Sequence, residues 1–462
     1  MFQLSAEDLS FIRVTVEFAD SFDQSLVLNR AVIDSRQVSI GDLFVCLKGE
    51  STDGHNFVKS AVTAGAKALL IDTDLSEFVK SQLRNLPPIL LLESSNVIFS
   101  LQQLAKLRRQ RFQGQVIGVV GSNGKTSTKE MLASLLKCRF GDDLVFATPG
   151  NLNNHIGLPL SVLAISDLHK FAVLELGMNH VGEIDLLSNI SRPNHVIVTS
   201  IGFEHMEFFK SIDEVALAEL EVVNGMNGGR ILYPASGPQL PHLQSIAVKN
   251  QVSVQLFELE NYCDGKINFQ GHNFSLGEYF GEAMASNLLS SVALILSENY
   301  MSATQLETCC RQLKPNIGGR LRIEMMGNTV VIDDSYNANP DSFRKSILAL
   351  REKLKNGRLL CLAGHMAELG HFSEVGHRQV GEDLKKAMFD QVIVCGNTDV
   401  KILMNSFSKD KPQHYFADSA LLASYIEENP NIISRFDGIL IKGSRSARME
   451  RLLPTLRKIL IE

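Results

Sequence analysis

The sequence predicts an α/β protein of three domains, with a central doubly wound parallel sheet that carries a phosphate-binding loop. Short apolar runs alternate with helical patterns along most of the chain, and a glycine-rich loop at residues 121–127 separates one run from a helix. The 462 residues are too many for one ordinary core, and Gly114 and the segment KPNIGGR are natural breaks. We place a small α/β domain, the central domain and a Rossmann-like α/β domain at residues 1–112, 113–314 and 315–462.

The first domain is predicted from three apolar runs between residues 26 and 97. LFVCL, ALLID and ILLLE indicate strands, and NFVKSAVTAGAKA between them indicates a helix. A further helix, SLQQLAKLRRQRF, ends in Arg108, Arg109 and Arg111. Such a basic end commonly compensates the helix dipole in solvent, and a phosphate contact is the alternative.

The second domain begins with the most informative segment of the chain. Residues 115–120 are apolar and β-branched, as in a buried parallel strand, and apolar side chains recur at helical spacing after the loop. Gly121 and Gly124 let the backbone turn its amides toward an anion, Lys125 can reach outer phosphates, and Thr126 can bind Mg²⁺. We call residues 121–127 the phosphate loop. Its predicted nucleotide contacts are Gly121, Ser122, Asn123, Gly124, Lys125, Thr126 and Ser127.

The phosphate loop is shorter than the common pattern GxxxxGK[ST], which would need glycine at Val119. A glycine turn that only caps a helix is the alternative reading of GxxGKTS. The strand, the Lys-Thr pair and the helix together favour nucleotide binding and phosphoryl chemistry.

The remaining apolar runs complete two sheets. QVIGVV, AVLEL, HVIVTS and RILYP alternate with helical patterns in the second domain, as in a doubly wound sheet. VVIDDS, LLCLAG, QVIVCG and GILIKGS do the same in the third. The last three of these runs lead into glycine at the carboxyl end, where sites lie in such sheets.

Two residues are candidate metal ligands. Glu175 interrupts the apolar run FAVLELGM, where a buried carboxylate is costly unless a metal or hydrogen bonds satisfy it. His205 follows the strand HVIVTS in the turn GFEHMEFF, although a histidine there can also be purely structural. With the Thr126 hydroxyl they would form a mixed set suited to Mg²⁺ with retained waters.

Two asparagine-rich segments are candidate binding loops. TPGNLNNHIGLPLSVL places Asn151, Asn153 and Asn154 between two strands of the nucleotide domain, so it is either a substrate-facing loop or an inert turn. DDSYNANPDS follows another apolar strand, and Asp334 in it could contact a ribose or a base. Its alternative role is to cap the helix that begins near FRKSILAL.

Composition narrows the class of protein. The formal net charge of -6 gives no general electrostatic reason to bind nucleic acid or an anionic membrane. The seven cysteines include no CxxC pair, so we expect reduced thiols in a cytosol. The amino terminus lacks a secretory pattern, and no apolar run approaches the roughly 20 residues that span a bilayer. We expect a cytoplasmic protein with small-molecule partners and without membrane insertion.

The motifs together resemble the Mur ligase family, the ATP-dependent enzymes that extend the peptide of bacterial cell-wall precursors. GSNGKTS, TPGNLNNHIGLPLSVL, ELGMNHVGEI and the GxxH turn occur in the family's order. DDSYNANPDS, HMAELG, KGSRSARME and the amino-terminal DSRQVSIGDLFVCLKGESTDGHNF resemble its dipeptide-adding branch, so the similarity covers almost the whole chain. The DNPR segment expected of the diaminopimelate-adding branch is absent, and folylpolyglutamate synthetases share the loop type but not this amino-terminal domain.

The resemblance implies a reaction and its participants. The terminal carboxylate of UDP-N-acetylmuramoyl-tripeptide would attack the γ-phosphate of ATP, and the amine of D-alanyl-D-alanine would then displace phosphate from the acyl phosphate. The three domains would bind the UDP-sugar, bind ATP and complete the ligase site. The cofactors would be ATP and Mg²⁺, and the reaction would belong to peptidoglycan precursor synthesis. Closure of the domains around the acyl phosphate is expected.

The resemblance also implies residue roles. Lys125 would neutralise phosphate charge, Thr126 would serve the Mg²⁺ on the ATP phosphates, and Glu175 with His205 would hold a second Mg²⁺. The positions that match adenosine contacts are Asn287, Arg320 and Asp334. The residues in the expected UDP-sugar region are Asp34, Ser35, Arg36, Lys48 and Asp53.

Some positions depart from the family pattern. Glu219 stands where most members carry a carbamylated lysine, so we expect it to act catalytically through a bridging water or a displaced helix, with a lost second-metal site as the alternative. Glu282 and Ala283 replace a common HN pair, and His365 replaces an aspartate. A family ligase with another substrate and a weakened regulatory homologue are the rival functions. The third residue of the peptide is open, and a monomer is favoured.

Overall fold

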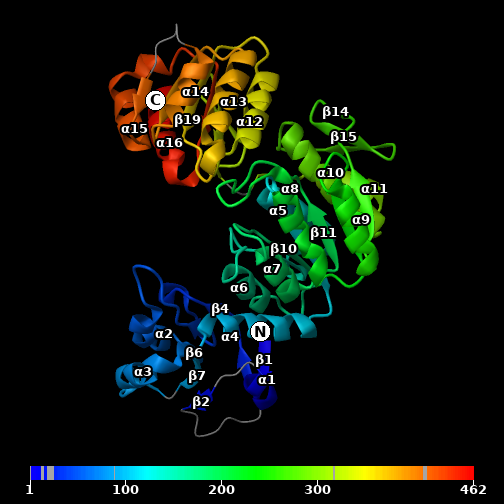
Figure 1. The fold of residues 1–462 in the computed structure, drawn as a ribbon, viewed down its shortest axis with the longest axis vertical. Helices are drawn as coiled ribbons and strands as arrows, with labels where there is room; N and C mark the ends of the chain where they lie inside the picture. Colours follow the sequence, from blue (N-terminus) through cyan, green and yellow to red (C-terminus); the bar gives the residue numbers. More distant parts are fainter. Residues whose placement is uncertain are drawn as a thin grey trace.

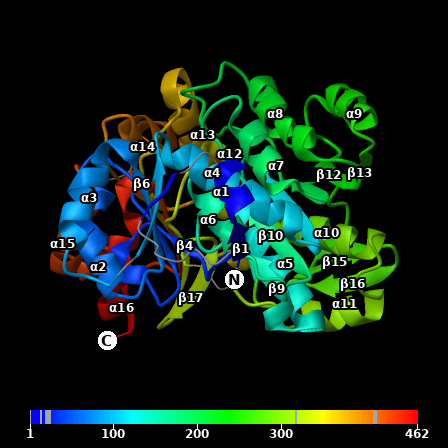
Figure 2. The ribbon, with the colours of Figure 1, turned by 90° about the horizontal axis from the view of Figure 1, so that it is seen from below.

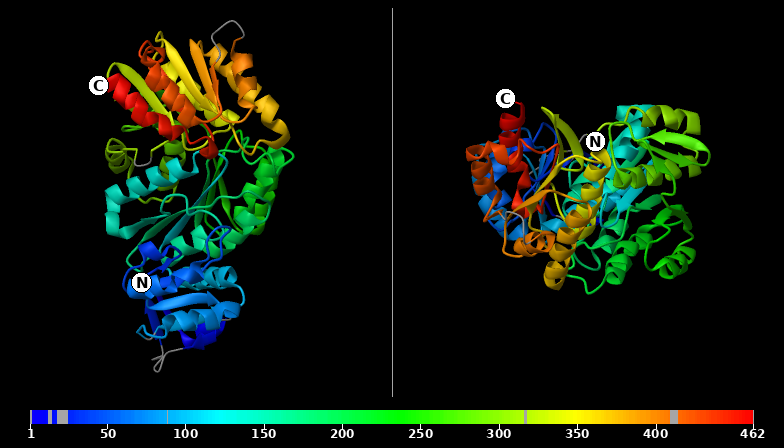
Figure 3. Two further views of the ribbon diagram at one scale, coloured as in Figure 1. Left: turned by 90° about the vertical axis from the view of Figure 1, so that its left-hand side faces the viewer. Right: turned by 90° about the horizontal axis from the view of Figure 1, so that it is seen from above.

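A computed structural model of the chain describes residues 2–11, 15–17, 25–87, 89–315, 318–408 and 414–461. Three α/β units follow one another along the long axis of the molecule in sequence order (Figures 1 and 3). The predicted α/β class and the parallel central sheet are confirmed. The boundaries after residues 112 and 314 stay predictions.

The amino-terminal unit contains a five-stranded sheet in the order β2-β7-β6-β5-β4, with β2 antiparallel to β7 and the other pairs parallel. A two-stranded antiparallel ribbon, β1-β3, accompanies it. The adjacent residues Phe44 and Val45 of β5 point to opposite faces of this sheet and belong to different apolar clusters. Helices α2 and α3 pack on the Phe44 face, and α4 packs on the Val45 face (Figure 2). The elements are β1 (Phe2–Ser5), α1 (Ala6–Phe11), β2 (Thr15–Glu17), β3 (Ser25–Leu28), β4 (Ala31–Val32), β5 (Leu43–Val45), α2 (Val58–Thr63), β6 (Ala68–Asp72), α3 (Ser76–Leu83), β7 (Leu90–Ser94) and α4 (Val97–Arg111).

The central unit is a six-stranded parallel sheet in the order β13-β12-β11-β8-β10-β9. In β8, Ile117 and Val119 join the cluster that contains α5 and α10, whereas Val116 and Val120 join the one with α4, α6 and α7. Burial on both faces explains the unbroken apolar run. The elements are β8 (Gln115–Val120), α5 (Lys125–Phe140), β9 (Val145–Ala147), α6 (Gly157–Leu163), β10 (Phe171–Glu175), α7 (Glu183–Ser191), β11 (His195–Val198), α8 (Ile212–Leu220), β12 (Arg230–Pro234), α9 (Leu240–Lys249), β13 (Ser253–Phe257), β14 (Tyr262–Cys263), β15 (Lys266–Phe269), β16 (His272–Ser275), α10 (Glu282–Ser297) and α11 (Ala303–Cys310).

The carboxyl-terminal unit is a six-stranded sheet in the order β17-β18-β22-β19-β20-β21, with helices on both faces. β17 is antiparallel to β18, and the other pairs are parallel. The elements are β17 (Arg322–Met326), β18 (Thr329–Asp334), α12 (Pro340–Lys353), β19 (Leu359–Gly364), α13 (Ser373–Lys386), β20 (Gln391–Cys395), α14 (Val400–Phe407), β21 (His414–Phe416), α15 (Ser419–Glu428), β22 (Gly438–Lys442) and α16 (Leu452–Ile461).

The structure adds features that the sequence did not predict. The antiparallel sheet β14-β15-β16 extends the central unit, and β17 adds an antiparallel edge to the third. A disulfide joins Cys138 of α5 to Cys309 of α11, so the expectation of reduced thiols is wrong for this pair. These cysteines are 171 residues apart, which is why local spacing could not reveal them. No helix in the described part of the chain is long and apolar enough to cross a membrane.

Candidate functional site

The phosphate loop lies at the carboxyl end of β8, between the neighbouring strands β10 and β11. Gly121 and Gly124 have φ angles of 117° and 89°, which favour glycine. A Cβ atom would lie 2.6 Å from Thr199 Oγ1 if added at residue 121, and 2.5 Å from Asn287 Oδ1 if added at residue 124. The close approach of the backbone to both side chains therefore requires glycine at the two positions.

A cavity of about 370 Å³ between the central and carboxyl-terminal units collects most of the predicted site residues. Those that line it are Ser122, Asn123, Gly124, Lys125, Thr126, Ser127, Asn151, Asn153, Asn154, Glu175, His205, Asn287, Arg320 and Asp334. Among the described residues, Gly121, Glu219 and the predicted UDP-sugar residues do not line it. We call it the nucleotide cavity.

Lys125, the first residue of α5, is held by the loop and by a carboxylate that the sequence did not single out. Its Nζ donates to the Gly121 carbonyl oxygen at 2.6 Å and lies 3.0 Å from both carboxylate oxygens of Glu204. Burial alone would lower the pKa of Lys125, but the charges of Glu204 and Glu219 outweigh it and raise that pKa above its ordinary value. The loop therefore presents a charged ammonium group.

His205 lies between two carboxylates from different units. Its Nε2 is 3.5 Å from Glu204 Oε1, and its Nδ1 is 2.6 Å from Oε2 of Glu368 in the carboxyl-terminal unit. Burial would lower the pKa of His205, yet its bonds to Glu204 and Glu368 raise that pKa to about 9. In this arrangement the imidazole is a cation at neutral pH.

Glu175 and Thr126 provide buried oxygens that lack protein hydrogen bonds. Asn153 Nδ2 donates to Glu175 Oε1 at 2.9 Å, whereas Glu175 Oε2 accepts none. Thr126 Oγ1 is likewise buried without a partner. Such oxygens are costly to bury unless another group meets them, and they are the donors that Mg²⁺ prefers. Within the described part of the chain, no three His, Cys, Asp or Glu residues are grouped closely enough to hold a metal by themselves.

Glu219 lies on α8 behind the phosphate loop and is fully buried. Its Oε2 accepts a hydrogen bond from the Gly121 amide at 2.9 Å, and its Oε1 is unpartnered. Burial raises the pKa of Glu219 to about 7, against the opposing charge of Lys125. Its visible contact is thus with the backbone that shapes the loop.

The carboxyl-terminal unit supplies the opposite wall of the nucleotide cavity. Asp334, at the end of β18, forms a buried ion pair with Lys442 and accepts a hydrogen bond from Ser346 Oγ at 2.5 Å. The Arg320 guanidinium carbon stacks 4.0 Å from the centre of the Tyr336 ring. Together these residues offer fixed charges and a flat surface to a ligand.

Hydrogen bonds join the two walls of the nucleotide cavity, the central unit and the carboxyl-terminal unit. Asn339 Nδ2 donates to Asn123 Oδ1 at 2.9 Å, and the Phe203 amide donates to Asp341 Oδ2 at 3.0 Å. The phosphate loop and the loop after β11 therefore both contact the start of α12.

The predicted UDP-sugar residues lie in the amino-terminal unit. Ser35 and Arg36 follow Asp34, whose carboxylate is 2.7 Å from Arg36 Nη2, and this hydrogen-bonded partner lowers the pKa of Asp34 to about 2. Lys48 and Asp53 face each other across an isolated antiparallel bridge. The unit therefore carries exposed basic groups, Arg36 and Lys48, beside the half-buried carboxylates of Asp34 and Asp53.

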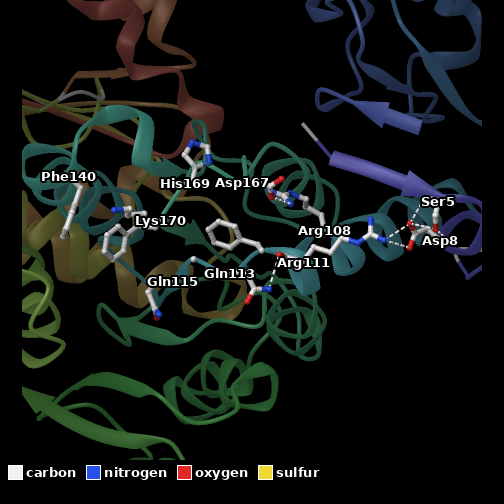
Figure 4. A pocket seen from close by; sticks show the side chains of 13 residues that line it. Ser5, Asp8, Arg108, Arg111, Gln113, Gln115, Phe140, Asp167, His169 and Lys170 are labelled. Carbon is white, nitrogen blue, oxygen red and sulfur yellow. Dashed lines mark hydrogen bonds and ion pairs between the residues drawn. The ribbon is translucent and has the colours of Figure 1, made fainter. Parts of the chain in front are cut away.

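A larger hollow of about 920 Å³, which we call the amino-edge hollow, lies where β8 and β10 begin (Figure 4). Its arginines are paired with protein groups: Arg108 Nη1 is 2.7 Å from Asp167, and Arg111 Nη2 is 2.6 Å from Asp8. Arg109 Nε donates to the Ser191 carbonyl oxygen at 2.6 Å. The basic end of α4 thus makes contacts within the protein.

The sequence reasoning missed several charged residues in or near the lining of the nucleotide cavity, among them Glu204, Lys129 and Lys442. Glu204 had a visible signal, because it precedes His205 in a turn at the end of a strand. Lys442 had one too, because it is a charged residue in the apolar run GILIKGS, as Glu175 is in FAVLELGM. Lys129 had none, since its burial depends on carbonyl groups that are distant in the sequence.

Comparison with known proteins places the three units in one family. Residues 119–295 match the Mur ligase middle domain, and residues 320–445 match the Mur ligase glutamate ligase domain. Residues 30–91 match the Mur ligase family catalytic domain.

Individual relatives span the same length. The UDP-N-acetylmuramoyl-tripeptide–D-alanyl-D-alanine ligase of Bacillus subtilis is 33% identical over 452 residues, which cover 94% of each chain. A crystal structure of MurF from Acinetobacter baumannii has a TM-score of 0.82 and 26% identity over 99% of both chains. MurF ligase from Thermotoga maritima in complex with ADP has a TM-score of 0.75 and 27% identity over 94% of this chain and 98% of that one.

Proposed function

The chain belongs to the Mur ligase family, and we infer that it is the ATP-dependent ligase that joins D-alanyl-D-alanine to UDP-N-acetylmuramoyl-tripeptide in peptidoglycan precursor synthesis. The observation that carries this function is the match over 94% of the chain to a ligase of that name. The match therefore includes the amino-terminal unit, the phosphate loop and the carboxyl-terminal unit. Because the reaction consumes ATP, we propose a cytoplasmic location.

The first step transfers the γ-phosphoryl group of ATP to the peptide carboxylate. A carboxylate oxygen forms a bond to phosphorus, the bond to the β-phosphate oxygen breaks, and ADP leaves. Lys125 and the loop amides would stabilise the charge on the transferring group, and no protein nucleophile is needed. ATP phosphates would replace Glu204 as the partner of the Lys125 ammonium group.

The second step forms the amide. The amine of D-alanyl-D-alanine attacks the acyl carbon, phosphate leaves, and the amine loses a proton. The acyl phosphate must be kept from water, and the contacts from Asn339 and Asp341 to the loops of the central unit support a closed arrangement.

Mg²⁺, when bound, would neutralise phosphate charge during the first step. Thr126 and Glu175 fit this ion, because each places a buried oxygen without a protein hydrogen bond near the phosphate loop. His205 would bind a metal only after it leaves Glu204 and Glu368 and loses its proton. Glu219, the fourth predicted catalytic residue, would act by holding the Gly121 amide.

The other predicted contacts divide between the substrates. Asn287, Arg320 and Asp334 would contact the nucleoside of ATP from both walls of the cavity. The asparagines of residues 151–154 would face the peptide. Ser35, Arg36, Lys48 and Asp53 would hold the UDP-sugar in the amino-terminal unit.

One assay tests the function. Purified protein receives ATP, Mg²⁺, the tripeptide nucleotide and D-alanyl-D-alanine, and phosphate release is followed against controls that omit one substrate at a time. We expect release only with all components and a product heavier by the dipeptide. Release without D-alanyl-D-alanine would indicate an ATPase, and release with another amine alone would indicate a family ligase of different specificity.

A further inference from the structure

Lys129 is a fully buried lysine for which the proposed mechanism gives no role. It lies one helical turn after Lys125 in α5, and its side chain is 0% exposed. Burying an ammonium group is costly unless charges and hydrogen bonds compensate it. Its contacts therefore indicate what the position requires.

Four oxygen atoms surround the Lys129 ammonium group. Nζ donates to the carbonyl oxygens of Thr148 at 2.7 Å and Gly150 at 3.0 Å. It also lies 3.0 Å from Glu130 Oε1 and 3.7 Å from Glu175 Oε2. One side chain thus connects the phosphate-loop helix, the segment after β9 and the end of β10.

The segment after β9 also makes hydrogen bonds to Glu175 at the end of β10. Thr148 Oγ1 accepts a hydrogen bond from the Glu175 amide at 3.0 Å, and Asn153 Nδ2 donates to Glu175 Oε1 at 2.9 Å. Glu175 Oε2 is the oxygen that faces Lys129 and that accepts no hydrogen bond. The direction of this carboxylate therefore depends on Lys129 and Asn153 together.

We propose that Lys129 is a positioning residue of the ligase reaction, which fixes the Glu175 carboxylate and residues 148–154 against the phosphate loop. It lies outside the lining of the nucleotide cavity and acts through groups that do line it. The proposal rests on the proposed function, because it assigns Glu175 and the asparagine segment to that reaction. A lysine that only stabilises the fold would have no selective effect on chemistry.

The test compares Lys129→Met with Lys137→Met, a change of a less buried lysine on the same helix. We expect Lys129→Met to lower kcat by about 100-fold, the scale measured for partners that orient site ligands, while the ADP dissociation constant changes less than about 3-fold. ADP binding should survive because the loop and Lys125 are intact. Lys137→Met should retain wild-type kcat. A kcat of Lys129→Met within about 3-fold of wild type overturns the proposal.

A second readout needs no turnover. Mn²⁺ binding in the presence of ADP, measured by electron paramagnetic resonance, should weaken about 10-fold or more in Lys129→Met, because Glu175 loses its orientation. Glu175→Gln and the double variant complete a mutant cycle. If Lys129 acts through Glu175, the double variant should lose little beyond the worse single variant, whereas fully additive losses contradict the proposal.

A folding control separates a loss of structure in the variants from a loss of function. Circular dichroism checks each variant, and Lys129→Gln, which keeps amide donors without the charge, replaces Lys129→Met if that variant does not fold. Failure of both variants to fold makes Lys129 a purely structural residue and overturns the proposal. If wild-type protein forms no ligase product, the proposed function fails. Mn²⁺ binding of the variant that stays within about 3-fold of wild type would reject the role of Lys129 independently.

Discussion

Helix α5 connects two hollows of opposite character. Its first residue, Lys125, lines the nucleotide cavity of about 370 Å³, and its last, Phe140, lines the amino-edge hollow of about 920 Å³. The smaller space is lined by a glycine loop, a lysine and buried oxygens that have no hydrogen-bond partner. In the larger space Arg108 and Arg111 are paired with aspartates, and the buried atom without a hydrogen-bond partner, Arg108 Nη2, belongs to a cation that is already paired. Unsatisfied groups at the carboxyl ends of parallel strands, rather than volume, identify the site.

The largest effect should come from Lys125→Ala. Loss of the ammonium group removes charge stabilisation from the transferring phosphoryl group, so we expect kcat to fall by about 1,000-fold or more. The fold should persist, because Lys125 packs against loop carbonyls and Glu204 rather than an apolar core. Steady-state phosphate release and circular dichroism measure the two quantities, and full activity would refute the assignment of the loop.

Gly124→Ala and Gly141→Ala compare the two ends of the helix directly. Both glycines have positive φ angles, 89° and 97°, but a Cβ at residue 124 meets Asn287 whereas one at residue 141 meets nothing within 4 Å. Each should lose about 1 kcal/mol of unfolding free energy from backbone strain. Only Gly124→Ala should also weaken ADP binding, by about 10-fold, because the loop must move. Equal ADP affinities in the two variants would contradict the claim that the close approach of the residue 124 backbone to Asn287 requires glycine.

A pH-dependent effect is expected from Glu219. Its pKa of about 7 lies above the ordinary 4.5, so the folded state binds the proton more tightly than the unfolded chain. Its contribution to stability is therefore present below about pH 4.5 and is lost as the pH rises through 7. Glu219→Gln stays neutral and can still accept from Gly121, so we expect it to be more stable than wild type by about 3 kcal/mol at pH 8 and by less than about 1 kcal/mol at pH 5.

Urea unfolding with a chelator present measures the effect of Glu219→Gln. Glu207→Gln, a change of an exposed carboxylate, is the control and should show no such pH dependence. A stability difference that is the same at pH 5 and pH 8 would show that Glu219 does not titrate in this range.

The smallest effect should come from Arg111→Met at the amino-edge hollow. The Arg111 side chain is 46% exposed, so its ion pair with Asp8 should contribute less than about 1 kcal/mol to the unfolding free energy. We expect unchanged kcat. A loss of turnover in this folded variant would mean that the larger hollow takes part in the reaction.

Local sequence patterns were sufficient to predict part of the fold and part of the candidate site. The phosphate loop is contiguous, and Glu175 stands out as a carboxylate inside an apolar strand. Glu204 was missed because its partner Lys125 is 79 residues away, and Lys129 because a lysine within a helix normally faces solvent. The unbroken apolar run at residues 115–120 predicted a buried parallel strand, and the structure confirms it, with Ile117 and Val119 in one cluster and Val116 and Val120 in the other. The β14-β15-β16 sheet and the disulfide depend instead on distant contacts.

ADP binding measured by calorimetry on wild type, Lys125→Ala and Arg111→Met tests the central claim most directly. The claim is that the nucleotide binds at the carboxyl-end cavity and not in the larger hollow. We predict that Lys125→Ala weakens ADP binding by about 10-fold or more and that Arg111→Met leaves it within about 2-fold of wild type. Wild-type affinity in Lys125→Ala together with a loss in Arg111→Met would contradict the account.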